Sequence, residues 1–417
     1  MRIPGGRILL GGRPVDLAAE PLKSGGQAAV FEVPGSPDLV VKVYRDDPTP
    51  EQERRLTRMM DLAPLGGRPT HEGQPPELAW PVELCRTPDG RFAGYAMRRF
   101  GEPGYVQLLG LFNRQSRLRH FPERADWRFL LGVSFNLSFM TARMHHQGLI
   151  VGDFSSNNVV VDRDGFITFL DCDSIGFTDP GTAEEFPCLM LTPEYCAPER
   201  QKGGPATEAT DDFALAILIY QLLTAGNHPF GGVRHDSDSD TSVKDNIAYS
   251  ASYVVRPEAV TVPRGIIDPA VLPPALLDLA RRAFGPGVED PSARPAAAEW
   301  LQALDGEWDK VRTCTARPHH TYGSHLRACP WCARPGQDLF NPAPRRPGAP
   351  ARPPVPQIPQ VAAVSRPDTI PPAPPAPFPP LLPVPDRAQA KFPAFVIAMI
   401  VLFVLLVVIA AIASGGA

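Results

Sequence analysis

The proline content of one segment limits what this chain can fold into more than any other feature. Between Pro342 and Asp386, 18 of 45 residues are proline, four are arginine and almost none is acidic. Proline lacks a backbone N–H and has a fixed φ, so this stretch cannot join a helix or the interior of a sheet. We expect residues 338–392 to form an extended, disordered linker. A packed domain must therefore be sought in the residues before it.

An apolar run follows the proline-rich segment. Residues 394–413 read AFVIAMIVLFVLLVVIAAIA, without a charged or strongly polar side chain. At about 1.5 Å per residue, a helix of this length spans the roughly 30 Å of a bilayer core. Arg387 and Lys391 precede the run, and no Lys or Arg follows it, which favours a cytoplasmic N-terminal side. We predict a single transmembrane helix over residues 393–414 that anchors a cytoplasmic domain in the cell membrane.

Charge and cysteine content argue against two classes of protein. The chain carries 41 basic and 45 acidic residues, a net charge of −4, so no bulk electrostatic attraction to nucleic acid is expected. We therefore expect no nucleic-acid partner. The seven cysteines are odd in number and contain one closely spaced pair, which argues against a secreted disulfide framework.

Residues 15–308 form a block with two kinds of pattern. The β-type runs AAVFEV and LVVKVY lie in its first third. Helical patterns follow over residues 128–147, 211–224 and 274–284. The block therefore predicts an α+β fold with a small β-rich N-terminal lobe, 15–101, and a larger helical C-terminal lobe, 102–308.

Three oxygen-bearing side chains have an informative spacing. Asn158 follows Asp153 by five residues, and Asp171 follows Asp153 by eighteen. Two strands joined at residues 162–165 would bring Asn158 and Asp171 to the same end of a hairpin. Carboxylate and amide oxygens suit a hard cation such as Mg²⁺ that bridges phosphates. These intervals resemble the catalytic loop and metal-binding motif of the protein kinase superfamily, here in a form similar to bacterial eukaryotic-like Ser/Thr kinases.

The resemblance continues on both sides of this motif. Upstream, LKSGGQAAVFEV is similar to the glycine-rich phosphate loop, and LVVKVY places Lys42 like the phosphate-binding lysine. Downstream, TPEYCAPE resembles the end of the activation segment, Asp211 takes the anchoring position of the next helix, and Arg294 would pair with Glu199. The resemblance implies a two-lobed protein-kinase-like fold that binds ATP with Mg²⁺. The residues it places at the nucleotide are Gly25, Gly26, Val30, Lys42, Met97, Asn158 and Asp171.

The family's mechanism assigns a role to each of these groups. Asp153 accepts or orients the proton of the attacking hydroxyl, and Lys42 positions the phosphates. Asn158 and Asp171 hold Mg²⁺. Most of the catalysis is positioning and neutralisation of phosphate charge.

In the family, a helix carboxylate pairs with the lysine. The segment PTPEQERRL is typical of a helix start, with Thr49 as cap and Pro50 at the first position. We choose Glu53 over Glu51 as the partner because it lies deeper in this helix. Both glutamates could instead only stabilise the helix N-terminus electrostatically.

Several positions depart from the family pattern. The catalytic loop reads Val-Gly-Asp, residues 151–153, in place of His-Arg-Asp, and Ser155 replaces a lysine. Asp173 replaces the glycine of the metal motif, and Gly25 is the one usual loop glycine that is kept. Two alternatives to a Ser/Thr protein kinase therefore stay open: a weakly catalytic pseudokinase scaffold that binds ATP, and a small-molecule phosphotransferase. The Ala-Pro-Glu segment, 197–199, favours protein substrates, which could include the chain itself.

A cysteine and histidine cluster follows the block, and we assign it to a separate element at residues 309–337. Four nitrogen and sulfur ligands suit a tetrahedral structural Zn²⁺, while Cys-x-x-Cys alone could also be a redox pair. The cluster is similar to an element appended to some bacterial kinase-like proteins. His319 and His325 are competing ligands. The ligands we choose are Cys314, His320, Cys329 and Cys332.

The resemblance also suggests partners. Kinase-like proteins of this kind can be accompanied by a metal-dependent protein phosphatase and a von Willebrand A-type protein. The combined expectation is a membrane-anchored Ser/Thr protein kinase.

Overall fold

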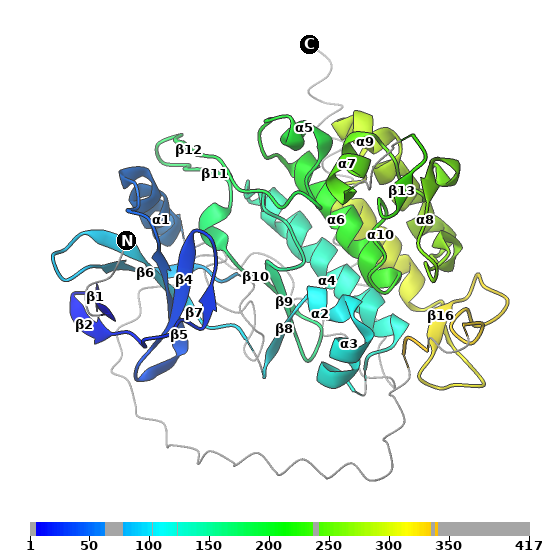
Figure 1. Ribbon diagram of the computed structural model, residues 1–417, viewed down its shortest axis with the longest axis horizontal. Coiled ribbons are helices and arrows are strands. Elements are labelled where there is room, and N and C mark those ends of the chain that lie inside the picture. The colour runs from blue at the N-terminus through cyan, green and yellow to red at the C-terminus, as the bar shows by residue number, and fades with distance from the viewer. Residues whose placement is uncertain are drawn as a thin grey trace, which may run out of the picture. The chain divides into compact units, whose positions relative to one another are not determined.

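An antiparallel sheet of seven strands forms the first part of the molecule (Figure 1). The computed structural model describes residues 6–62, 78–101, 103–122, 124–236, 242–334 and 338–340. The strands are ordered β2-β1-β6-β7-β5-β4-β3. Their bounds are β1 Arg7–Leu10, β2 Arg13–Asp16, β3 Lys23–Ser24, β4 Ala28–Val33, β5 Ser36–Tyr44, β6 Pro81–Arg86 and β7 Phe92–Arg98.

The predicted β-type runs are strands of this sheet, but its start differs from the prediction. The sequence boundary at residue 15 is too late, because β1 pairs with β2 and, at Leu10, with Cys85 of β6. Ile8 and Leu10 of β1 join Val41 and Val43 of β5 in the apolar core of the sheet. The signal was weak because β1 is only four residues long and lies between glycines.

One glycine fixes the distance between β5 and β7. Gly94 lies opposite Val43 in the ladder, and a Cβ at this position would collide with the carbonyl of Lys42. Only glycine allows the two strands to approach this closely. Gly94 therefore helps to set the position of Lys42.

Helix α1, Pro50–Leu62, begins where the sequence predicts. The Thr49 hydroxyl accepts a hydrogen bond from the backbone N–H of Gln52, and the Gln52 side chain accepts one from Thr49 N–H. This reciprocal pair is a capping box. The helix packs on β6 and β7 and buries Arg55, Leu56 and Met59.

The second part of the molecule is mainly helical, as the periodicity predicts. Helices α4, α6 and α10 lie side by side (Figure 1). Asp126 caps α4, and Thr207 caps α6 in a capping box with Thr210. The α-helices are α2 Leu109–Phe112, α3 Arg114–His120, α4 Trp127–His146, α5 Pro198–Gln201, α6 Glu208–Leu223, α7 Val243–Ala248, α8 Pro274–Phe284, α9 Pro286–Glu289 and α10 Ala297–Trp308.

Small sheets complete the helical part. The predicted hairpin is formed by β9 and β10, which pair antiparallel from Val159–Phe169 to Val161–Ile167, and β8 joins β9 on its other edge. Strands β15 and β16 pair in the Cys/His segment. The bounds are β8 Tyr105–Gln107, β9 Val159–Asp162, β10 Ile167–Phe169, β11 Phe177–Thr178, β12 Glu185–Phe186, β13 Val233–Arg234, β14 Val260–Thr261, β15 Val311–Thr313 and β16 Thr321–Gly323.

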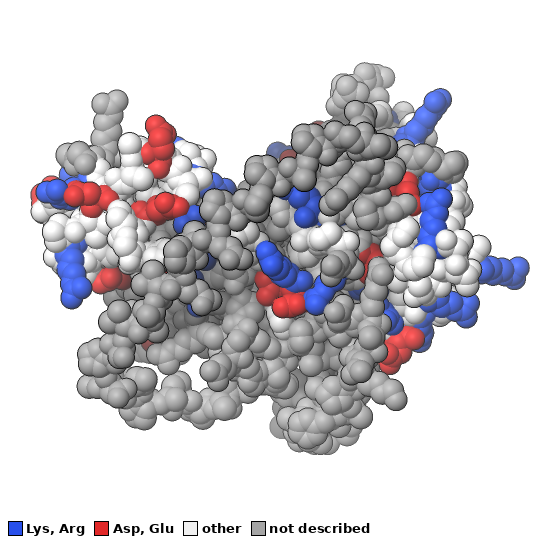
Figure 2. All heavy atoms as spheres, turned by 90° about the horizontal axis from the view of Figure 1, so that it is seen from below, with Lys and Arg blue, Asp and Glu red and all other residues white. Residues whose placement is uncertain are grey.

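On the face shown in Figure 2, acidic and basic side chains of the described residues are interspersed. The predicted linker beyond residue 340 and the predicted transmembrane helix, 393–414, lie outside the described residues. Among the helices that the structure describes, none combines the length and the hydropathy needed to cross a membrane.

Candidate functional site: a catalytic loop, a buried lysine and a Cys/His cluster

The loop between α4 and β9 holds Asp153 in a defined orientation. Asn158 Nδ2 donates to the Asp153 backbone oxygen and to its Oδ2, both at 3.0 Å. The Thr192 hydroxyl donates to Asp153 Oδ1 at 2.7 Å. Both carboxylate oxygens therefore have a fixed partner. The sequence analysis quoted the segment that contains Thr192 but missed this contact.

Asp211 of α6 anchors the same loop through hydrogen bonds to its backbone. Its carboxylate accepts hydrogen bonds from the backbone N–H groups of Val151 and Gly152, at 2.7 and 2.8 Å. His145 Nε2 lies 3.1 Å from Asp211 Oδ2. Burial acts to lower the pKa of His145, but the hydrogen bond and attraction to Asp211 raise it above the usual value. This is the anchoring position that the sequence predicts for Asp211.

Glycine is required at position 152. Its φ is +74°, and a Cβ there would overlap the side chain of Cys188. An L-residue would be strained by the backbone conformation as well as by the contact. Gly152, which differs from the family residue at this position, is therefore required by the local backbone conformation and by the contact with Cys188.

Asn158 and Asp171 lie at the same end of the β9–β10 hairpin. The backbone N–H of Leu170 donates to the Asn158 carbonyl at 2.7 Å, which brings the following Asp171 beside the asparagine. Asp171 adopts a left-handed conformation with φ 53°, and its side chain is 48% exposed. Carboxylate and amide oxygens are donors that suit a Mg²⁺ ion that keeps several waters. The residues present therefore fit the ion that the sequence predicts.

Lys42 of β5 is buried next to two carboxylates. Its Nζ lies 2.7 Å from Asp173 Oδ1 and 3.3 Å from Asp171 Oδ1. Burial disfavours the charged ammonium, but the two carboxylates, Asp173 foremost, raise the pKa of Lys42 above its usual value. Burial likewise acts to raise the pKa of Asp173, and Lys42 lowers it below the usual value.

The expected ion pair between Lys42 and Glu53 is not formed. Glu53 contacts the Arg86 guanidinium of β6 instead. The side chain of Glu53 is 32% exposed, whereas that of Lys42 is 11% exposed. The sequence analysis was correct about the helix start but wrong about this contact, because helix periodicity does not tell which residue faces the lysine.

The residues expected to contact a nucleotide lie in the glycine-rich turn, on β4, β5 and β7, and at one end of the β9–β10 hairpin. Val30 of β4 pairs with Lys42 of β5, and Met97 of β7 pairs with Val40. In the glycine-rich turn, Gly25 N–H donates to the Ala28 carbonyl at 2.9 Å, while Gly26 has open space around its Cα. Nucleotide contact by these residues stays a prediction.

The structure contains a cavity of about 840 Å³, and none of the seven residues expected at the nucleotide is among those that line it. Apolar groups from both parts of the molecule line it, including Leu22 before β3, and Val160 and Leu170 next to the catalytic residues. Phe100 and Gly101, which follow β7, also line it. The lining also contains polar side chains, and a cavity with both kinds of group suits a small organic ligand. The sequence pattern does not reveal this lining, because apolar residues in strands usually pack in the hydrophobic core.

The segment 193–204 is fastened to the helical part by an ion pair. Arg294 Nη1 and Nη2 lie 2.6 and 2.8 Å from the two oxygens of Glu199. The Arg294 side chain is fully buried, so removal of its partner would leave an uncompensated charge, at a cost of about 3–5 kcal/mol. The predicted pair is confirmed, and it holds the Ala-Pro-Glu segment in place.

Three arginines of α1 contact the segment that follows Asp173. Arg55 donates to the carbonyls of Ile175, at 2.8 Å, and Pro187. Its guanidinium also lies over the rings of Phe177 and Phe186. Arg54 and Arg58 pair with acidic residues of the same hairpin, Glu184 and Asp179. Strands β11 and β12 are thus held against α1 by charge and by stacking.

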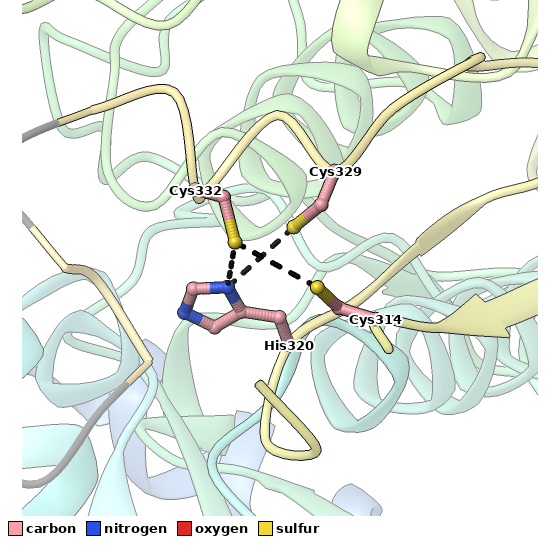
Figure 3. Close-up of side chains that lie close together, drawn as sticks. All are labelled: Cys314, His320, Cys329 and Cys332. Carbon is pink, nitrogen blue, oxygen red and sulfur yellow. Dashed lines mark hydrogen bonds between the residues drawn. The ribbon is translucent and has the colours of Figure 1, made fainter. Parts of the chain in front are cut away.

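The four predicted zinc ligands converge (Figure 3). Cys314 Sγ lies 3.6 Å from Cys332 Sγ, and His320 Nδ1 lies 3.5 Å from the Sγ atoms of Cys329 and Cys332. All four ligand atoms lie within 4.8 Å of one another. Zn–S bonds of about 2.3 Å give tetrahedral edges of about 3.8 Å. The donor set and its spacing therefore fit a tetrahedral zinc ion.

The structure also distinguishes the competing histidines. His325 Nε2 lies 3.2 Å from the Ala270 carbonyl, and His319 Nε2 lies 3.7 Å from Asp338. His320 Nε2 lies 2.8 Å from Asp338 Oδ1, and this contact leaves Nδ1 directed at the cysteines. Asp338 lies beyond the predicted element, 309–337, and was missed for that reason.

The Cys/His segment is packed on the helical part rather than separate from it. The Thr321 hydroxyl accepts from the backbone N–H of Arg128 in α4. The buried Arg117 of α3 donates to the Leu339 carbonyl at 2.7 Å and lies over the Phe340 ring. Trp331 is also buried, and its ring contacts Phe340. The element therefore extends to residue 340.

Comparison with known proteins agrees with this geometry. Residues 108–304 match the family model of the protein kinase domain. The protein kinase YegI of Escherichia coli strain K12 is 29% identical over 329 residues, which cover 76% of this chain and 48% of YegI. The DNA damage-responsive serine/threonine-protein kinase RqkA of Deinococcus radiodurans is 29% identical over 243 residues, 56% of this chain and 32% of RqkA.

A shorter match is found in eukaryotes. The cGMP-dependent protein kinase 2 of Rattus norvegicus is 35% identical over 91 residues, 22% of this chain and 11% of that protein. The chain spans about half the length of YegI, so YegI contains a large region that has no counterpart in the match.

Proposed function

We propose that the chain transfers the γ-phosphate of ATP to serine or threonine hydroxyls of protein substrates; the match of residues 108–304 to the family model of the protein kinase domain supports this proposal. The observation that carries the proposal is the fixed orientation of Asp153. Its two oxygens accept hydrogen bonds from Thr192 and Asn158, and Lys42 and Asp171 lie in contact beyond the hairpin. All four residues that the chemistry requires are therefore kept.

Asp153 is the group that meets the attacking hydroxyl. Its Oδ1 and Oδ2 each retain lone pairs beyond those used by Thr192 and Asn158, so the carboxylate can accept the hydroxyl proton and orient the oxygen for attack. Lys42 would hold phosphate oxygens through its ammonium. Asn158 and Asp171 would hold Mg²⁺, which neutralises developing phosphate charge when bound.

A protein substrate fits better than a small molecule. The Ala-Pro-Glu segment, 197–199, is fastened by the buried Arg294, and residues 189–191 just before it include the exposed Leu189 and Leu191. Apolar side chains exposed beside Asp153 offer a surface on which an extended peptide can lie. The chain itself is one candidate substrate.

The test is phosphate transfer from labelled ATP by the full chain, with Asp153→Ala as the matched variant. We expect label in protein with the wild type and at least a hundredfold less with the variant, because the proton acceptor is lost. Bound ATP without labelled protein would favour a pseudokinase scaffold. ATP turnover that a metabolite stimulates, with no labelled protein, would favour a small-molecule phosphotransferase.

The remaining features complete the proposal. The Cys/His cluster holds a structural Zn²⁺, for which the ligand spacing is the support. The apolar run at 394–413 anchors the chain in the cell membrane with the kinase domain on the cytoplasmic side. A metal-dependent phosphatase that reverses the modification and a von Willebrand A-type protein are proposed partners, and their support is the family resemblance alone.

A further inference from the structure

The counter-ion of the buried Lys42 is Asp173, which follows β10, whereas the family uses a carboxylate on the helix that corresponds to α1. Lys42 Nζ lies 2.7 Å from Asp173 Oδ1, and the side chains of both residues are 11% exposed. The second contact, to Asp171, is longer at 3.3 Å, and that carboxylate is 48% exposed. An ion pair shielded from water is less screened than an exposed one. Asp173 is therefore the main electrostatic partner of Lys42.

Helix α1 does not supply this partner. Its Glu53 is paired with Arg86 of β6. The buried face of α1 carries Arg55, Leu56 and Met59, and Arg55 is directed at the carbonyls of Ile175 and Pro187. A cation on this face would repel Lys42 rather than hold it. Among the described contacts of α1, none joins a carboxylate to Lys42.

Asp173 is held in place by groups other than the lysine. The hydroxyl of Tyr95 donates to Asp173 Oδ1, and the hydroxyl of Tyr44 donates to Oδ2, both at 2.8 Å. Tyr44 belongs to β5, the strand of Lys42, and Tyr95 lies opposite Lys42 in β7. The carboxylate thus accepts three hydrogen bonds from the sheet. Such a cage offsets the cost of burying a charge.

We propose that Asp173 is the positioning residue for Lys42 and replaces the helix carboxylate of the family. The ammonium has three N–H donors. Asp173 and Asp171 take two of them, and the third is left for a phosphate oxygen of ATP. The placement of Lys42 then depends on the turn at residues 171–174 and not on the position of α1. The inference rests on the proposed function only in that ATP is the ligand of Lys42.

The experiment is a double-mutant cycle on MgATP binding by the full chain. Asp173→Asn keeps the shape of the side chain and removes its charge, and Lys42→Met removes the ammonium. If Asp173 acts through Lys42, each single variant binds MgATP about tenfold more weakly, and the double variant binds no more weakly than Lys42→Met alone. A residue that supports only the fold would give additive losses.

A second cycle pairs Lys42→Met with Glu53→Gln. The proposal expects their effects on MgATP affinity to be independent. Coupling between Lys42 and Glu53, or additive effects of Lys42 and Asp173, overturns it, as does a wild-type chain that binds no MgATP. Asp173→Gly, which restores the family residue, is the second variant if Asp173→Asn does not fold. It should show the same coupling.

A kinetic measurement adds a second readout. Mispositioning of the lysine should raise the KM for ATP and lower kcat in Asp173→Asn, while the KM for the protein substrate stays unchanged. A loss of active molecules would lower kcat alone. Coupled binding in a chain that labels no protein would contradict the proposed function and leave the inference intact.

Discussion

At the scale of single residues, the orientation of Asp153, the proposed proton acceptor, depends on its neighbours. Thr192 donates to Asp153 Oδ1 at 2.7 Å and lies 39 residues away in sequence. A hydrogen bond to a charged group contributes about 1.5–3 kcal/mol. The contact therefore contributes to the orientation of the Asp153 carboxylate, which we propose meets the substrate hydroxyl.

Thr192→Val should lower kcat about tenfold to a hundredfold, because Asp153 loses the donor that fixes one oxygen. Thr192→Ser keeps the hydroxyl and is the matched control, with activity near that of the wild type. Initial rates at saturating ATP measure the effect. Equal rates for the valine and serine variants would show that the hydrogen bond has no catalytic role.

Another carboxyl affects stability rather than catalysis. Burial raises the pKa of Asp212 in α6 to about 7, while an aspartate in an unfolded chain titrates near about 3.9. Between about pH 4 and pH 7 the unfolded chain therefore loses a proton that the folded chain keeps. The free energy of unfolding falls as the pH rises through this window.

Asp212→Asn should flatten this pH dependence. The amide oxygen can still accept from the Ala297 backbone N–H, a contact of 3.0 Å in the wild type, but it cannot ionise. We expect the variant to gain stability relative to the wild type from pH 5 to pH 8, measured by denaturant unfolding. Asp61→Asn, at a side chain that is 63% exposed, is the control. An unchanged pH profile in Asp212→Asn would contradict the assignment.

At the scale of elements, the sequence pattern predicted which helices and strands exist, and in what order, better than it predicted the side-chain contacts between them. The strand runs, the β9–β10 hairpin and the three long helices follow from periodicity and turn residues. The partner of Lys42 did not, because the residue that faces it depends on how α1 is rotated against the sheet. Asp173 was visible as a departure from the family pattern, but its role required the positions of Tyr44 and Tyr95.

The Cys/His element shows the same division. Spacing and the resemblance to a known cysteine-rich element selected four ligands, which converge in the structure. The spacing did not predict the residue that orients the histidine. This residue is Asp338, which contacts His320 Nε2 at 2.8 Å. A carboxylate that binds the second nitrogen of a metal-bound histidine fixes the tautomer and the direction of the ring.

Asp338→Asn should therefore weaken zinc binding about 10-fold to 100-fold, measured as zinc retained by the full chain against a competing chelator. Cys332→Ser should remove the ion, where the wild type holds one zinc per chain. Both variants should also lower the thermal unfolding midpoint, because Trp331 and Phe340 pack beside the cluster. A wild-type chain without bound metal would refute the site.

At the scale of the whole molecule, the Cys/His element and the helical part share one packed unit, Met1–Asn341. Arg117 of α3 and Arg128 of α4 both bond to it. The predicted boundary at residue 309 followed the end of the kinase-like motifs and the start of the Cys/His cluster, whereas packing against the helical part continues across it to residue 340. A change of sequence pattern therefore does not mark the end of a domain here, because buried contacts join the segments on both sides of it.

The membrane anchor is the prediction that belongs to the full chain. Deletion of residues 393–414 should move the protein from the membrane fraction to the soluble fraction, since no other run in the sequence has comparable length and hydropathy. An equally long deletion within the proline-rich segment, residues 353–374, is the matched control and should leave the protein in the membrane fraction. Fractionation with an immunoblot measures both.

Orientation is tested separately, because an apolar run alone does not determine it. Arg387 and Lys391 precede the run and no basic residue follows it, so a reporter fused after Ala417 should be active outside the cytoplasm. A variant can move the basic residues to the other side of the run: it combines Arg387→Ala and Lys391→Ala with two lysines added after Ala417. Because basic residues are retained on the cytoplasmic side, this variant should have a reversed or mixed orientation. A cytoplasmic reporter in the unaltered chain would overturn the predicted orientation.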